Sequence, residues 1–202
     1  MSSTNRGYER HKTDYYITPQ EPIKVFLSEF LSDVKKGKFI DDITGIANRP
    51  DRIKWFDPCA GGDNEFQMSY PAVIEREFGA EVDTMDVRED SRAKRKEDYL
   101  LADLNYKPDV IITNPPFFIA REVIEKALED VVDGGYVIML LRLNFFGSKE
   151  RFNFFQKYMP ILSYVHQRRF SFTKDKKTDS IEYMHAVWQK GQSPDFTMLK
   201  II

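Results

Sequence analysis

Apolar runs alternate along the chain with apolar residues at helical spacing. Two uninterrupted apolar runs, residues 110–112 and 136–141, are typical of strands covered on both faces. The pattern therefore predicts an α/β domain. The expected strands are residues 53–56, 81–86, 99–104, 110–114, 136–141, 162–172 and 181–189, and the expected helices are residues 19–36, 69–79, 118–132 and 149–158.

Two of the helices begin at candidate capping residues. Thr18 suits an N-cap, Pro19 suits the first helical position, and Glu21 completes a capping box. Ser69 is expected to cap the second helix with its hydroxyl group.

Composition fits one domain, residues 15–202, preceded by a polar arm at residues 1–14 that is expected to be mobile. The formal net charge is -2, so a nucleic-acid surface would have to be a local patch. One cysteine and three scattered histidines predict no disulfide and no metal site. No signal peptide or membrane-spanning segment is expected, which predicts a cytoplasmic protein without a membrane partner.

The run at 110–114 leads into Asn114-Pro115-Pro116-Phe117. Pro115 disfavours a helical Asn114, so the segment should form a rigid extended elbow at the carboxyl end of a strand, where open α/β sheets bind ligands. The Asn114 amide oxygen and the Pro115 carbonyl could accept both hydrogens of a planar amino group. Such acceptors would favour a pyramidal nitrogen whose lone pair can attack, and Phe117 could stack beside it.

This elbow resembles motif IV (Asn/Asp-Pro-Pro-Tyr/Phe/Trp) of the S-adenosylmethionine-dependent amino-methyltransferases. The resemblance implies that Asn114, Pro115, Pro116 and Phe117 are catalytic. Asn114 would also contact the cofactor. A strand followed by a simple proline turn is the alternative.

Residues 57–64, Asp-Pro-Cys-Ala-Gly-Gly-Asp-Asn, resemble motif I (Asp-Pro-x-x-Gly-x-Gly) of the same enzymes, with Asp63 at the place of the last glycine. This implies that Asp57, Pro58, Cys59 and Gly61 contact the cofactor. An acidic turn would repel a phosphate but suits a sulfonium and an ammonium, which favours S-adenosylmethionine over NAD or ATP. Cys59 lies in the cofactor turn and is not interpreted as a nucleophile.

Other expected cofactor residues lie near further strand ends. Asp86, 29 positions after Asp57, suits a ribose contact, with an exposed strand-end carboxylate as the alternative. Asp103 ends a segment that resembles motif III. Thr18 and Pro19 belong to a Tyr-x-Thr-Pro segment that resembles motif X, although a capped helix explains them equally well.

Residues expected to contact the substrate follow later in the chain. Arg142 comes at the end of an apolar strand and would line the substrate entrance. A basic cluster with interleaved aromatics suits unpaired nucleic acid, while a flexible surface hairpin is the open alternative. Its residues are Arg168, Arg169, Phe170, Phe172, Lys174, Lys176 and Lys177.

Over residues 14–190 the motif order resembles the γ arrangement of N6-adenine DNA methyltransferases. This family includes small, single-domain phage forms. The resemblance implies a Rossmann-like class I methyltransferase fold: seven strands in the order 3-2-1-4-5-7-6, mostly parallel, with strand 7 antiparallel in an edge hairpin. It also implies DNA methylation of the restriction-modification type, in the host cytoplasm for a phage enzyme. No segment is long enough for a target-recognition domain, so a separate specificity subunit would supply it.

Three alternatives remain open from the sequence. RNA adenine and protein glutamine also present a planar amino group. The third alternative is a non-catalytic subunit that binds S-adenosylmethionine. The sequence leaves the oligomeric state and the recognition site undetermined.

Overall fold

The computed structural model describes residues 17–37, 42, 44–172 and 180–202. The predicted arm and the cluster residues Lys174, Lys176 and Lys177 lie outside these ranges. The helices are α1 (Gln20–Lys35), α2 (Ser69–Phe78), α3 (Ala120–Asp130) and α4 (Phe152–Lys157), with short 3₁₀ turns η1 (Pro50–Arg52), η2 (Phe117–Ile119), η3 (Leu143–Phe146) and η4 (Lys149–Arg151). The strands are β1 (Trp55–Asp57), β2 (Val82–Asp86), β3 (Arg95–Lys96), β4 (Val110–Thr113), β5 (Tyr136–Arg142), β6 (Leu162–Val165), β7 (Tyr183–Gln189) and β8 (Met198–Ile201).

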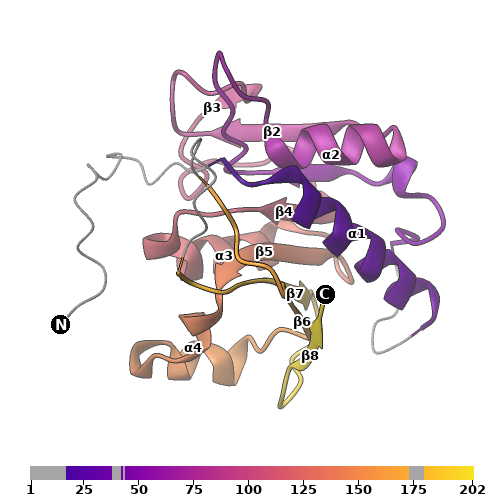
Figure 1. The fold of residues 1–202 in the computed structure, drawn as a ribbon, viewed down its shortest axis with the longest axis vertical. Coiled ribbons are helices and arrows are strands. Elements are labelled where there is room, and N and C mark those ends of the chain that lie inside the picture. Colours follow the sequence, from indigo (N-terminus) through magenta and orange to yellow (C-terminus); the bar gives the residue numbers. More distant parts are fainter. Residues whose placement is uncertain (1–16, 38–41, 43, 173–179) are drawn as a thin grey trace.

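One sheet of eight strands runs through the molecule in the order β3-β2-β1-β4-β5-β7-β6-β8, from the top to the bottom of Figure 1. β7 pairs antiparallel with both β5 and β6, and the other pairings are parallel. The predicted Rossmann-like α/β class, the order of the first seven strands and the antiparallel seventh strand are confirmed. The predicted number of strands is wrong, because β8 adds an eighth strand beyond β6.

The sheet is buried on both faces, and its central strand shows how. Val110 and Ile112 of β4 pack into the core that α1 and α2 cover, whereas Ile111 packs into the core of α3 and α4. All three side chains are fully buried. The apolar run at 110–113 therefore reflects a strand with helices on both sides, as expected for a parallel sheet. Figure 1 shows α1 and α2 on one side of the sheet and α3 on the other.

The predicted strand at 99–104 is wrong. Asp98 starts a turn there, with its carboxylate accepting the Leu100 N–H at 3.0 Å and its carbonyl accepting the Leu101 N–H at 3.0 Å. Such a local bond competes with a strand ladder. The third strand is instead the two-residue β3, where Arg95 pairs with Met85.

Both predicted capping roles are also wrong. α1 begins at Gln20 with extended Pro19 before it, and no side chain caps the helix. Ser69 is the first residue of α2 and not its cap, which is Met68. The Thr18 hydroxyl instead accepts a hydrogen bond from Asn114, the residue directly after β4, and both residues line the same cleft.

The predicted strand at 162–172 ends early, at Val165 of β6. Beyond it the chain leaves the sheet, and Phe170 packs face to face with Tyr183 at a ring-centroid distance of 5.2 Å. Among the described residues, none of the helices is both long and apolar enough to cross a membrane.

Candidate active site

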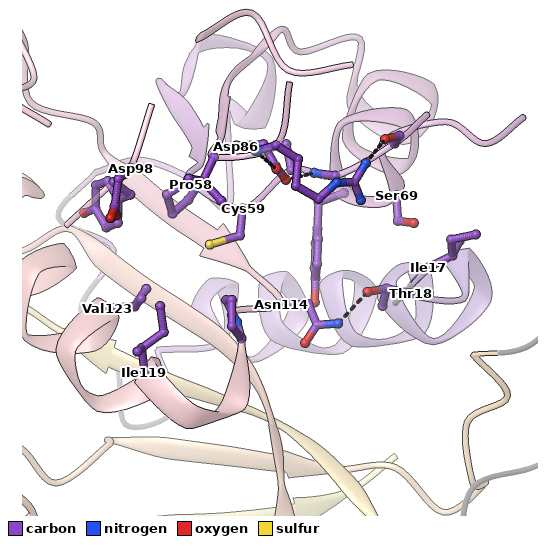
Figure 2. Close-up of a pocket in the computed structure, with 18 of the residues that line it drawn as sticks. Ile17, Thr18, Pro58, Cys59, Ser69, Asp86, Asp98, Asn114, Ile119 and Val123 are labelled. Carbon is purple, nitrogen blue, oxygen red and sulfur yellow. Dashed lines mark hydrogen bonds between the residues drawn. The ribbon is translucent and has the colours of Figure 1, made fainter. Parts of the chain in front are cut away.

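A cleft opens where β1, β2, β3 and β4 reach their carboxyl ends, which is the edge where open α/β sheets bind ligands. It encloses about 820 Å³ of space, partly open to solvent. Figure 2 shows Pro58, Cys59, Asp86 and Asp98 on one side and Asn114 with Thr18 on the other. The lining is completed by Ile17, Ala60, Gly61, Gly62, Gln67, Ser69, Tyr70, Val87, Arg88, Tyr99, Leu100, Pro116, Ile119 and Val123.

The glycine-rich turn forms the floor of this cleft. Gly62 has a φ of +73°, and a Cβ there would lie 3.0 to 3.2 Å from Met68 and Arg92. A side chain is therefore excluded at Gly62. Asp63, which stands where the related motif has glycine, turns away to accept the N–H groups of Glu65 and Phe66 at 2.8 and 2.9 Å. The departure from the motif thus closes the turn and leaves the cleft open.

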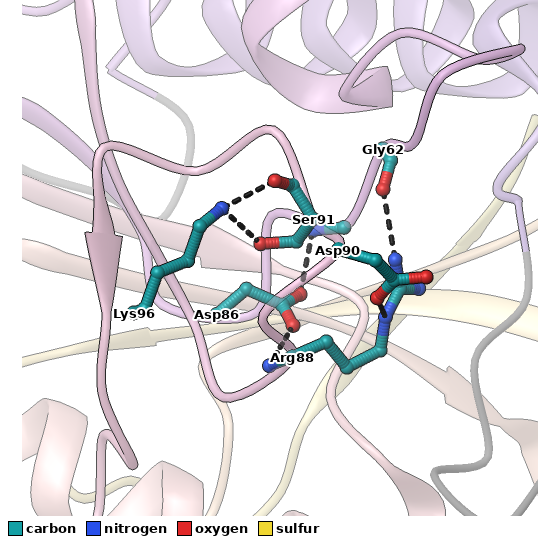
Figure 3. Close-up of polar contacts among 7 residues, drawn as sticks. Gly62, Asp86, Arg88, Asp90, Ser91 and Lys96 are labelled. Carbon is teal, nitrogen blue, oxygen red and sulfur yellow. Dashed lines mark hydrogen bonds and ion pairs between the residues drawn. The ribbon is translucent and has the colours of Figure 1, made fainter.

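Asp86 joins the glycine-rich turn to the end of β2. Its carboxylate accepts the Gly61 N–H at 2.8 Å and the Arg88 N–H at 2.8 Å (Figure 3). The Arg88 guanidinium in turn donates to the Gly62 carbonyl at 2.9 Å and to Asp90 at 3.1 Å. Asp86 is therefore held in one orientation at the wall of the cleft, with lone pairs left over for a hydroxyl group.

Asp57 lies beneath the cleft and not on its wall. It is buried, and its carboxylate accepts the Cys59 N–H at 3.2 Å. Burial raises the pKa of Asp57 to about 7, with a further increase from the charge of Asp86. Burial likewise raises the pKa of the Cys59 thiol, so this side chain in the cleft stays protonated and is a poor nucleophile.

Asn114 follows β4 directly and shows one unpaired acceptor. Its Nδ2 donates to Thr18 Oγ1 at 3.0 Å, which fixes the orientation of the amide (Figure 2). Its Oδ1 is buried and has no hydrogen-bond partner among the described residues. A buried acceptor without a donor is costly, so an oriented one in a cleft indicates a ligand that supplies an N–H or O–H.

The remaining elbow residues divide between the cleft and its entrance. Pro116 lines the cleft, whereas Pro115 is buried behind it. Phe117 is half-buried beside Tyr183, at a ring-centroid distance of 6.0 Å. The Arg142 guanidinium lies over the Phe117 ring, 4.4 Å from its centroid. The structure thus brings Arg142 from the end of β5 to the elbow formed by residues 114–117.

Besides Asp57, two more predicted cofactor residues do not line the cleft. Pro19 ends the segment before α1, and Asp103 is exposed beyond the turn at 98–102. Asp98 occupies the cleft wall in place of Asp103. An acidic residue directly before two apolar residues, as in Asp98-Tyr99-Leu100, is the signal that could have identified it.

The predicted basic cluster is only partly a free surface. Phe170 is 2% exposed and stacked on Tyr183, so it offers no face to a base, and the predicted stacking role does not agree with the structure. Arg169 pairs with Glu182 at 2.8 Å. Arg168 is exposed. Only Arg168 and Arg169 therefore remain as candidate phosphate contacts among the described residues of the cluster.

A buried polar chain leads away from the cleft and was not predicted. The Tyr70 hydroxyl lies 2.9 Å from His185 Nε2, and His185 Nδ1 lies 2.8 Å from His166 Nε2. Burial lowers the pKa of His166 to about 4 and that of His185 well below its ordinary value, so both rings are neutral at pH 7. No sequence signal joins these residues, because Tyr70 and His185 are 115 positions apart.

The chain has the fold of the class I S-adenosylmethionine-dependent methyltransferases. A proposed methyltransferase of that class from Listeria monocytogenes superposes with a TM-score of 0.62 at 14% identity, over 98% of this chain and 68% of the other. A proposed RNA methyltransferase from Pyrococcus horikoshii gives 0.58 at 18% identity, over 93% of both chains. The M protein of the type I restriction enzyme EcoKI gives 0.55 at 12% identity, over 86% of this chain and 49% of that protein.

No protein-family model and no curated protein sequence matches the chain. The fold is therefore established by structural similarity alone, and the function has to be inferred from the residues of the cleft.

Proposed function

We propose that the chain is an S-adenosylmethionine-dependent methyltransferase that methylates N6 of adenine in DNA. The observation that carries this proposal is the buried, unpaired Asn114 Oδ1, oriented by Thr18 at the carboxyl end of β4. An amide oxygen in this position accepts an N–H and suits an amino group as the methyl acceptor.

The cleft residues fit this cofactor. Asp86 and Asp98 bring carboxylates to the wall, and the guanidinium of the lining residue Arg88 is held by the Gly62 carbonyl and by Asp90. The positive φ of Gly62 makes a side chain strained at that position. These features suit a nucleoside that carries a sulfonium and an ammonium and has no phosphate. Asp86 would hold ribose hydroxyls, and the Gly61–Gly62 backbone would border the cofactor. When bound, the cofactor supplies an electrophilic methyl group.

Asn114 would act on the amino group of the substrate. Its Oδ1 accepts one N–H, and the Pro115 carbonyl is proposed to accept the other. Both bonds strengthen as the nitrogen becomes tetrahedral and its protons more acidic, so they stabilise the transition state more than the ground state. Asn114 and the Pro115 carbonyl would hold the nitrogen while it takes the methyl group from the sulfonium, which would leave as a neutral thioether, and the surplus proton of the nitrogen would pass to water.

The aromatic and cationic groups at the entrance favour a nucleobase as the acceptor. Phe117 offers a ring for stacking, and the Arg142 guanidinium lies over that ring, with its Nε unpaired among the described residues. In duplex DNA the adenine would have to leave the stack to reach Asn114. The structural likeness to a restriction-enzyme M protein supports DNA and a separate specificity subunit, and the likeness to a proposed RNA methyltransferase keeps RNA as the second candidate.

The test is methyl transfer from labelled S-adenosylmethionine to four acceptors: duplex DNA, denatured DNA, RNA and protein. The nucleic-acid products are digested to nucleosides to locate the methyl group. N6-methyladenine in DNA supports the proposal. Label found only in RNA, or only in protein glutamine, would show that DNA is not the acceptor and would identify the acceptor as RNA or protein. Cofactor binding without transfer to any acceptor would support a non-catalytic subunit, and calorimetry with S-adenosylmethionine and NAD tests the cofactor separately.

A further inference from the structure

The side chain of Phe118 is an exposed aromatic directly beside the proposed catalytic motif. Its ring is 74% exposed, although its neighbour Phe117 is half-buried. Removing a phenylalanine side chain from water is favourable. A ring left in water at the entrance to the cleft is therefore a surface ready to bind a partner.

The ring is held on a rigid support. Pro115 and Pro116 restrict the backbone before it, and η2 continues into α3, whose first residue Ala120 is buried. The Ile119 N–H donates to the Pro116 carbonyl at 3.1 Å. Phe118 thus projects from a supported turn, and little conformational entropy would be lost when it binds.

Phe118 and Asn114 must meet the same short stretch of substrate. Phe118 comes four positions after Asn114, so their Cα atoms are at most about 15 Å apart, which is roughly four base steps along a DNA strand. The Arg142 guanidinium lies over the ring of Phe117, the neighbour of Phe118, and so brings a cation to this pair of aromatic residues. An exposed aromatic with a nearby unpaired cation fits stacked bases on a phosphate backbone.

We propose that Phe118 enters the base stack next to the target adenine and fills the gap that this base leaves when it moves to Asn114. The inference rests on the proposed function. It adds that Phe118 offsets part of the free energy needed to unstack the target base in a duplex substrate. A single strand, which has little stacking to lose, should depend on Phe118 much less.

The test compares Phe118→Ala, Phe118→Trp and the parent on the same unmethylated plasmid DNA, native and heat-denatured. Phe152→Ala is the matched control, because Phe152 on α4 is 61% exposed and away from the catalytic motif. We expect Phe118→Ala to lower kcat/KM on native DNA about tenfold or more and on denatured DNA less than about threefold. Phe118→Trp and Phe152→Ala should resemble the parent on both.

Two results for the variants would overturn the inference. One is a Phe118→Ala protein that methylates native DNA at the parent rate, and the other is an equal loss on native and denatured DNA. S-adenosylmethionine affinity, measured by calorimetry, shows whether the variants keep their fold. If the parent methylates only denatured DNA, the role of Phe118 is rejected while the proposed function stands. If the parent methylates no nucleic acid, the proposed function fails and this inference fails with it.

Discussion

The proposed cofactor side and the proposed acceptor side of the site are built in different ways. On the proposed cofactor side (residues 57–63, 86–91 and 98–100), two carboxylates are held by backbone: Asp86 by the N–H groups of Gly61 and Arg88, and Asp98 by that of Leu100. On the proposed acceptor side (residues 117, 118, 142 and 168), which lies outside the lining of the cleft, Phe118 is exposed and the Arg142 Nε is unpaired among the described residues.

This contrast determines which kind of ligand each side can recognise. A carboxylate held by backbone N–H groups is already oriented, which suits a small ligand of constant shape and lowers the entropy cost of binding it. An exposed ring and a guanidinium on a flexible stem suit a larger partner whose position varies along a strand. Mutations on the cofactor side should therefore alter cofactor affinity, and those on the acceptor side should alter only the use of the substrate.

Asn114 lies between the two sides, and its substitution should have the largest effect. We expect Asn114→Ala to lower methyl transfer at least a hundredfold, about 3 kcal/mol in activation free energy, because the lost bond strengthens in the transition state. Cofactor affinity should stay nearly unchanged. Single-turnover kinetics and calorimetry measure the two quantities, with exposed Asn153→Ala as the control. Transfer at the parent rate would reduce Asn114 to a strand-end residue.

The chain formed by Tyr70, His185 and His166 should make the protein sensitive to acid. The folded-state pKa of His166 is about 4, below the unfolded value of about 6.5, so unfolding takes up a proton in this window. Stability is then fully present above pH 6.5 and is lost as the pH falls toward 4. At pH 5 the loss from His166 alone should reach about 2 kcal/mol.

Urea unfolding at pH 7.5 and pH 5 measures this effect. His166→Gln should lose less stability than the parent between these two pH values, whatever its stability at pH 7.5. An identical loss in both proteins would show that His166 is protonated equally well in the folded and unfolded states.

Substitutions at two places test which arginines bind DNA: Arg142, which lies over the Phe117 ring, and the pair Arg168 and Arg169 of the basic cluster. We expect Arg142→Ala to weaken DNA binding about tenfold, roughly 1.4 kcal/mol, and to leave cofactor affinity unchanged. The double change Arg168→Ala with Arg169→Ala should have a smaller effect, because Arg169 already pairs with Glu182. Each lost phosphate contact should flatten the salt dependence of binding by about 0.9.

A salt titration of DNA binding compares the parent with both variants. Equal salt slopes in all three proteins would move the DNA-binding surface away from these arginines. If the double change weakens DNA binding more than Arg142→Ala does, the main phosphate contact lies at Arg168 and Arg169.

Thr18 should give the smallest of these effects. Thr18→Val removes the acceptor that orients the Asn114 amide, so transfer should fall about fivefold, near 1 kcal/mol. Thr18→Ser keeps the hydroxyl and should restore the parent rate. The ratio of kcat between the two variants is the measurement, and a serine variant as slow as the valine variant would contradict an orienting bond.

Local patterns predicted the central sheet because its strands are buried on both faces, as β4 and β5 show. The same reasoning failed at Tyr99-Leu100-Leu101, where the apolar run is a turn and Leu101 is 84% exposed. It also misplaced Phe170, since an aromatic among cations does not reveal which way it points. Contacts between distant positions, such as Thr18 with Asn114 and Tyr70 with His185, leave no local signal.

The bond between Thr18 and Asn114 spans 96 positions of the chain. Closing a flexible loop of that length costs roughly 4 kcal/mol in chain entropy. The packing of α1 must offset this cost before the amide can be oriented. Under the proposed function, turnover would therefore depend on the docking of α1 as well as on the chemical step. A protein with an intact β4 but an undocked α1 would have a folded central sheet and would be inactive.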